Sequence, residues 1–228
     1  KNQIEKKNSA FGYADRFDEK YDFVRTLRIG KYKYIRNYQP FNMDALYNNY
    51  RYKMLAYKEW LNHYKEGKLN KIQSQFFESR SPEALFNIEE DPHEVNDISK
   101  NINYGKILKQ MRKELRKRLL AMPDLSFYPE SHLLENALEN PTKFGKKQQK
   151  EIVELIAIAD LNLAPYEKVK EEIKNTLVNK NPWKRYWGLV VCSSFGDKAL
   201  DFAPQIKKIF MEDEENLVKI RAAEYLML

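Results

Sequence analysis

Polar and apolar residues alternate in two short stretches near the start of the chain. The stretches YDFVRTLRIG and KYKYIRNY meet at Ile29-Gly30, where glycine favours a tight turn. A third alternating stretch, ALFNI, occupies residues 84–88. Alternation with a period of two is typical of half-buried strands. The pattern therefore predicts a hairpin and a further antiparallel strand, in a sheet of three or four strands.

The segment EEDPHE follows the third stretch and carries the signals of a helix start. Asp91 is placed as the N-cap, Pro92 as the first helical residue, and Glu94 at the third position. An acidic or hydroxyl N-cap with a glutamate three residues later forms a capping box. We therefore expect a turn that leads into a short capped helix.

The chain between the second and third stretches has a helical period. Six large side chains are spaced three or four residues apart, as on one stripe of an amphipathic helix: Tyr47, Tyr50, Met54, Tyr57, Leu61 and Tyr64. This stripe favours a single helix packed on the rest of the domain. An exposed tyrosine stripe that stacks on sugar rings is the alternative.

Helical patterns continue to the end of the chain after a proline-containing segment, AMPDLSFYPESH. NPWKRYWGLVV and ENLVKIRAAEYLM superpose with Arg185 on Arg221, a period of 36 residues, and resemble HEAT-type helical repeats. We expect an α+β fold: a small antiparallel sheet with a covering helix over residues 1–122, a linker over 123–145, and an all-α, HEAT-like region over 146–228. Neither end carries a cap or leader signal, so we expect a piece of a longer protein.

The net charge of +7 is concentrated on one predicted helix, residues 105–120, which holds seven basic residues and one acidic residue. Leu108, Met111, Leu115 and Leu119 lie on one face of that helix. The helix can pack with its basic face in solvent, or it can bind an anion. The rest of the chain is close to neutral, which counts against a nucleic-acid groove, and we expect no nucleic-acid partner.

Side chains typical of catalysis or metal binding are sparse. The three histidines, His63, His93 and His132, are too far apart in sequence for a ligand pair on one helix, and Cys192 is the single cysteine. The apolar runs are too short to span a membrane. We expect no metal site and no catalytic residue in this chain.

One charged group is a candidate for ligand contact. The phrase ADRFDEKYD places Asp15, Asp18 and Glu19 around Arg16. Mixed charges beside a strand commonly form a surface ion-pair cluster. They can also form the polar mouth of a binding site for an anionic or hydroxylated ligand.

Two separated motifs resemble one family in the same order. FGYADRFDEKYDFVRTLRIGKYKYIRNYQP, followed after an insertion by EALFNIEEDPHEVNDIS, resembles the C-terminal part of a sulfatase of the alkaline-phosphatase superfamily. The resemblance extends over residues 11–120. It implies that the strands pair in one small sheet crossed by a long helix, and that the Asp-Pro turn leads from the last strand towards that helix.

The resemblance also implies which parts of the enzyme lie elsewhere. Sulfatases use a formylglycine, made in a C/S-x-P-x-R motif, beside a calcium ion. Both belong to an N-terminal catalytic domain, which would be the partner of this chain. Here Cys192 is followed by SSFG, so the motif is absent. We therefore expect this chain alone to be inactive, with formylglycine and calcium supplied only by the catalytic domain.

The resemblance further implies a substrate and a location. We expect sulfated carbohydrate as the substrate of the full enzyme, and a periplasmic or secreted protein. Asp15 and Arg16 are the predicted substrate-binding residues, with a structural ion pair as the alternative for both. A different hypothesis is a non-catalytic helical-repeat module that binds carbohydrate or protein through Trp183, Tyr186 and Trp187, unless these aromatics fill the interface between repeats.

Overall fold

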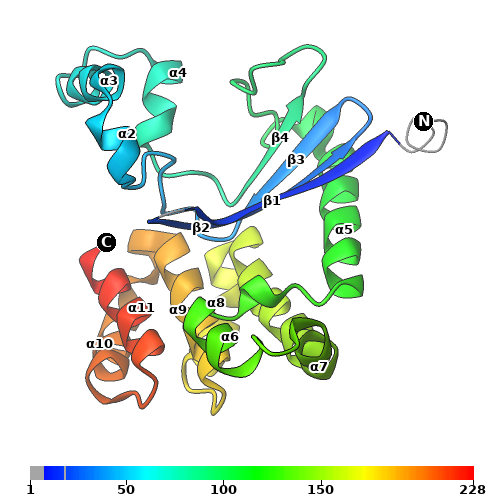
Figure 1. The fold of residues 1–228 in the computed structure, drawn as a ribbon, viewed down its shortest axis with the longest axis vertical. Coiled ribbons are helices and arrows are strands. Elements are labelled where there is room, and N and C mark those ends of the chain that lie inside the picture. The colour runs from blue at the N-terminus through cyan, green and yellow to red at the C-terminus, as the bar shows by residue number, and fades with distance from the viewer. Residues whose placement is uncertain (1–7, 18) are drawn as a thin grey trace. The chain divides into compact units, whose positions relative to one another are not determined.

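Figure 1 shows the computed structural model, which describes residues 8–17 and 19–228. The backbone separates into two compact units, Lys1–Leu115 and Arg116–Leu228, called here the sheet unit and the helical unit. The boundary between them falls inside helix α5 (Gly105–Ala121).

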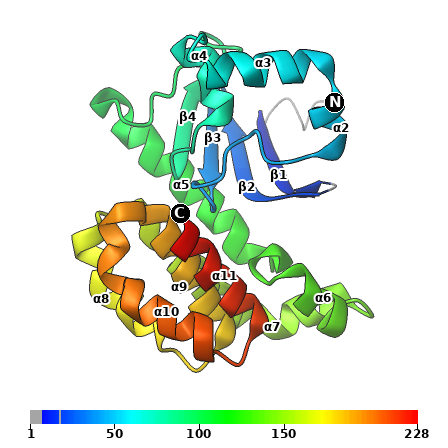
Figure 2. The same cartoon turned by 90° about the vertical axis from the view of Figure 1, so that its left-hand side faces the viewer.

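The sheet unit contains a four-stranded antiparallel sheet in the order β1-β2-β3-β4 (Figure 2). The strands are β1 (Ser9–Phe17), β2 (Lys20–Ile29), β3 (Tyr32–Asn37) and β4 (Glu83–Asn87). The predicted hairpin is confirmed: Ile29 pairs with Tyr32, and Gly30 has a φ of 57°. Tyr34 pairs with Leu85, so the two motif strands share one ladder. The α+β prediction is therefore correct.

One face of the sheet is buried under α5. Phe23, Leu27 and Tyr34 are buried on the sheet, and Leu108 and Met111 are buried on the helix. A carboxylate network joins the two layers, because Glu83 of β4 accepts hydrogen bonds from both Tyr34 and Arg112. Successive residues of a strand point to opposite faces, so the sequence neighbours of these strand residues point away from α5.

The insertion between β3 and β4 is broken into short helices, contrary to the single helix predicted. It contains α2 (Asn49–Lys53), α3 (Leu55–Lys65), α4 (Lys71–Ser74) and a 3₁₀ turn, η1 (Gln75–Phe77). Met54 separates α2 from α3 because its backbone is extended, with a ψ of 130°. The break divides the tyrosine stripe: Tyr57 packs in a small aromatic core with Phe77, whereas Tyr47 and Tyr50 are exposed.

The short helix predicted after β4 is absent, and the capping box is wrong. Residues 91–98 form a loop in which the Asp91 carboxylate accepts hydrogen bonds from the amides of Val95 and Asn96. Glu94 has a φ of 54°, which is outside the helical region. Its carboxylate turns to Lys33 of β3 rather than back to the Asp91 amide. A long-range ion pair therefore replaces the local cap.

The helical unit contains the end of α5 and six further helices: α6 (Glu130–Asn136), α7 (Pro141–Ala159), α8 (Tyr166–Leu177), α9 (Pro182–Phe195), α10 (Ala203–Glu212) and α11 (Asn216–Met227). The 3₁₀ turns η3 (Leu125–Phe127), η4 (Asp160–Leu163) and η5 (Gly196–Phe202) connect them, and η2 (Ile102–Tyr104) precedes α5. Helix α9 is central, since it contacts α7, α8 and α11. Figure 1 shows these helices from green to red.

The segment 123–145, expected as a linker, contains η3, α6 and the first turn of α7. Trp187 of α9 is 1% exposed, and its indole donates to the carbonyl of Phe127 at 2.8 Å. This part of the chain therefore packs into the helical unit. Within the described residues, the helices are too short or too polar to cross a membrane.

Candidate functional site

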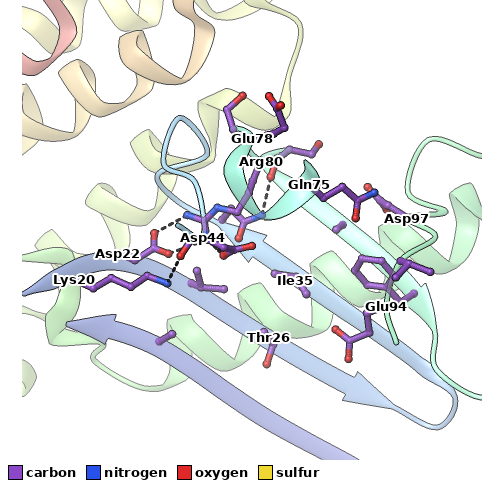
Figure 3. Close-up of a pocket in the computed structure, with 18 residues that line it drawn as sticks. Lys20, Asp22, Thr26, Ile35, Asp44, Gln75, Glu78, Arg80, Glu94 and Asp97 are labelled. Carbon is purple, nitrogen blue, oxygen red and sulfur yellow. Dashed lines mark hydrogen bonds and ion pairs between the residues drawn. The ribbon is translucent and has the colours of Figure 1, made fainter. Parts of the chain in front are cut away.

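A cavity of about 500 Å³ lies on the face of the sheet that points away from α5 (Figure 3). Its floor consists of apolar side chains from all four strands, among them Val24, Ile35, Ala84 and Phe86. Polar residues of the insertion and of the loop after β4 form its walls. The volume is in the range of ligand pockets in proteins.

One wall depends on a buried ion pair between the insertion and β2. The Arg80 guanidinium binds both carboxylate oxygens of Asp22, at 2.8 and 2.7 Å. The Asp22 side chain is 4% exposed, and its other contacts include the Phe23 amide. Arg80 also donates to the carbonyl of Asn42 and reaches Asp44 at 3.4 Å. Arg80 thus fixes two parts of the insertion above the sheet.

The opposite wall is held by the loop after β4. Lys33 Nζ lies 2.6 and 2.7 Å from the two oxygens of Glu94. Asp97 accepts a hydrogen bond from the Leu85 amide at 3.0 Å. A left-handed backbone conformation is unfavourable for a residue with a side chain. The ion pair and the loop contacts therefore have to offset the conformational energy of Glu94.

Acidic groups outnumber basic ones in this cavity. Five carboxylates line it, against two basic side chains: Asp22, Asp44, Glu78, Glu94 and Asp97, with Lys20 and Arg80. Thr26, Gln75, Ser79 and Ser81 add neutral polar groups. Carboxylates accept hydrogen bonds from hydroxyl groups and repel anions. The arrangement suits a hydroxyl-rich ligand with an apolar face better than a sulfate group.

The predicted binding residues lie on β1, beside the cavity rather than in its lining. Asp15 forms an ion pair with Arg25 of β2, with 2.6 Å between Oδ1 and Nη1. The Arg25 guanidinium also lies over the Phe23 ring, 4.3 Å from its centroid. Arg16 is exposed and lies opposite Tyr21 in the ladder. The structure therefore does not bring Asp15 and Arg16 together with the cavity residues, and their contact with substrate stays a prediction.

The other members of the charged phrase are separated from Arg16. Glu19 accepts a hydrogen bond from Asn48 at 3.1 Å, and Asp18 lies outside the described residues. Lys20 and Asp22, which follow in the same phrase, line the cavity instead. The alternation in KYDFV was the signal that could have identified them, since it places Lys20 and Asp22 on one face of β2.

The remaining predicted groups belong to buried packing. Cys192 is fully buried, and burial raises the pKa of its thiol to about 12, which disfavours the thiolate form that a nucleophile needs. Trp183, Tyr186 and Trp187 are at most 8% exposed. They therefore fill the helical core and do not offer a binding surface. On α5, Arg112 pairs with Glu83, and Arg116 pairs with Asp160.

The described residues do not fit the cofactors that the resemblance implies. Across 8–17 and 19–228, no three His, Cys, Asp or Glu side chains are grouped so that they could hold a metal ion. Cys192 lies in the middle of α9 and lacks the C/S-x-P-x-R context. That calcium and formylglycine belong to a separate catalytic domain stays a prediction from the resemblance.

Comparison with known proteins gives one partial match. No protein-family model matches the chain. Over 122 residues, 53% of its length, the chain is 40% identical to an ulvan-active sulfatase of Formosa agariphila. The match covers 20% of that protein, so the chain corresponds to about a fifth of its length. Part of this chain is therefore related to part of a sulfatase.

Proposed function

We propose that this chain is the C-terminal part of a sulfatase that removes sulfate esters from a sulfated glycan. The observation that carries the proposal is the 40% identity to an ulvan-active sulfatase over 53% of the chain. The shared ladder of Tyr34 and Leu85 supports it, because the resemblance required both motif strands in one sheet. The sheet unit would then pack against a catalytic domain encoded upstream.

In this proposal the catalytic domain supplies the reaction chemistry. Formylglycine would provide the nucleophile, and calcium would offset charge on the sulfate. This chain would contribute structure and contacts to the glycan. The enzyme would be periplasmic or secreted, and helices α7 to α11 would form a HEAT-like tail. Arg185 is the fourth residue of α9 and Arg221 the sixth residue of α11, so the two arginines aligned by the 36-residue period both lie in the first half of a helix, which supports the repeat.

We further propose that the cavity accepts an unsulfated, hydroxyl-rich part of the glycan. The floor of Val24, Ile35 and Phe86 would contact the apolar face of a sugar ring. Glu78 and Asp97 would accept hydrogen bonds from hydroxyl groups. The excess of carboxylates would direct sulfate groups away from the cavity.

The full-length protein tests the first proposal. We expect a C/S-x-P-x-R motif upstream of Lys1, and release of inorganic sulfate from ulvan by the purified full-length protein. The 228-residue chain alone should release none. Absence of the motif, or a full-length protein that carries it but releases no sulfate from any sulfated glycan tried, would reject a sulfatase.

The variant Ala84→Phe tests the cavity. The larger side chain would fill the floor without removing a polar group, so KM for the glycan should rise several-fold. Turnover of a small sulfate ester should stay the same. Ala56→Phe, at an exposed position of α3, is the matched control. Unchanged KM in Ala84→Phe would remove the cavity from the substrate site.

A further inference from the structure

Two segments of the helical unit contain basic residues and no acidic ones. They are residues 116–123, which include the end of α5, and residues 140–150, which include the first half of α7. Together they hold seven basic residues: Arg116, Lys117, Arg118, Lys143, Lys146, Lys147 and Lys150. Their combined charge equals the formal net charge of the chain, +7, and the other 33 basic residues are equal in number to the 33 acidic ones.

The fold brings the two segments side by side. Gln149 of α7 donates its side-chain amide to the carbonyl of Leu120 at 2.7 Å. Gly145 approaches Pro123 so closely that an added Cβ would lie 3.1 Å from the proline ring. The start of α7 is therefore packed against the end of α5 through Gly145 and Gln149. The basic residues of these two adjoining segments are called here the α5–α7 basic surface.

Most of this charge is exposed and uncompensated. Arg116 pairs with Asp160. By contrast, Lys117 and the four lysines of α7 are exposed, and none of the five forms an ion pair within the described part of the chain. Like charges at this spacing repel one another, and only solvent and salt screen them.

Lys143 of α7 also opposes the helix dipole. Lys143 occupies the third helical position, and the first turn contains no acidic residue. The N-terminus of a helix carries partial positive charge, so cations there are unfavourable and anions are favourable. Local stability therefore does not account for Lys143, whereas an anionic ligand at the helix start would be favoured by both this lysine and the dipole.

We propose that the α5–α7 basic surface binds a sulfated polysaccharide chain and keeps the polymer attached to the enzyme. The proposal rests on the proposed sulfatase function, which supplies a polyanionic substrate. Single-stranded nucleic acid fits less well because it needs aromatic platforms. Phe144, the aromatic residue among the lysines, packs against Tyr128 and His132 instead.

Charge reversal in α7 tests the surface. In K143E/K147E/K150E the helix start gains acidic residues, so the fold should be retained, as thermal unfolding will verify. Affinity of the 228-residue chain for ulvan should fall at least about tenfold, and wild-type affinity should fall steeply with added salt. The control K168E/K207E/K208E alters exposed lysines on α8 and α10 by the same charge. Its affinity should stay within about twofold of wild type.

Three results would overturn the proposal. The first is a K143E/K147E/K150E variant that binds ulvan as tightly as wild type. The second is a control variant that loses as much affinity for ulvan as K143E/K147E/K150E. The third is a wild-type chain that binds desulfated ulvan or DNA as tightly as ulvan. The outcome is separable from the sulfatase proposal. In the full-length protein, K143E/K147E/K150E should slow sulfate release from the polymer and leave a small sulfate ester unaffected. If the full-length protein released no sulfate, lysine-dependent binding of ulvan would still support the surface.

Discussion

The two units use different interactions in their interiors. In the sheet unit, charged side chains cross between elements: Arg80 binds Asp22, Arg25 binds Asp15, and Lys33 binds Glu94. The helical unit is centred on α9, whose buried residues are mainly apolar. Ion pairs such as Arg185–Asp213 and Lys184–Glu154 also link its elements. Directional ion pairs hold loops in defined positions, as a cavity requires, whereas apolar packing stabilises without fixing a polar geometry.

The largest effect is expected from Trp187→Ala in the helical unit. The side chain is almost fully buried, and its indole binds the Phe127 carbonyl. Truncation should leave a cavity and lower the free energy of unfolding by about 3–5 kcal/mol. Denaturant unfolding followed by Trp183 fluorescence measures it. A loss below about 1 kcal/mol would contradict a core centred on α9.

Arg80→Met should have the next largest effect, confined to the sheet unit. It leaves the Asp22 carboxylate buried without its partner, which costs about 3 kcal/mol. The double variant Asp22→Asn/Arg80→Met should recover part of the loss, since no charge is then buried alone. Fluorescence of Trp60, which packs on Phe76 and Phe77 of the insertion, reports this unit. If both variants were equally unstable, the ion pair would not be the cause.

Two substitutions at Glu94 distinguish the contribution of the ion pair to stability from that of backbone strain. Glu94→Gln loses the charge pair with Lys33 and keeps the left-handed backbone, so the free energy of unfolding should fall by about 1 kcal/mol. Glu94→Gly also loses the pair but relieves the strain, and should lie close to wild type. Chemical denaturation compares the two. A glycine variant less stable than the glutamine variant would argue against strain at this position.

The smallest effect is a pH dependence of the helical unit. Burial lowers the pKa of His132, which packs against Trp183, and Glu151, Glu135 and Glu215 only partly offset it. His132 binds a proton more readily in the unfolded chain than in the folded one. The free energy of unfolding is therefore highest above the unfolded pKa of His132, near 6.5. It falls as the pH drops from there towards the lower folded pKa. Thermal unfolding between about pH 7.5 and pH 5.5 should show this slope, reduced in His132→Gln.

Local signals predicted the hairpin and the last strand because their causes are local. Glycine at position 30 permits the turn, and alternation in EALFN places Leu85 on the buried face. The tyrosine stripe predicted one helix, but Met54 interrupts it. The Tyr52 and Tyr57 rings lie 4.8 Å apart across the break, in a tilted arrangement, and Tyr47 lies 4.9 Å from Tyr52. Aromatic packing of the insertion thus competes with helical periodicity.

The candidate site was predicted less well than the fold. The acidic and basic residues of the cavity come from β2, the insertion and the loop after β4, and only the folded sheet brings them together. Sequence patterns favoured Asp15 and Arg16 because they are adjacent to other charges. Adjacent residues of a strand point to opposite faces, however, so closeness in sequence does not make a site.

The sequence by itself determined the strands of the hairpin, the helical second half and the relationship to sulfatases, because these depend on residue order and local backbone preferences. The tertiary structure alone decided that Glu94 pairs with Lys33, that Arg80 closes a cavity, and that the start of α7 packs against the end of α5. These contacts link residues that are distant in sequence. Such contacts form only when burial of the apolar faces brings the elements together.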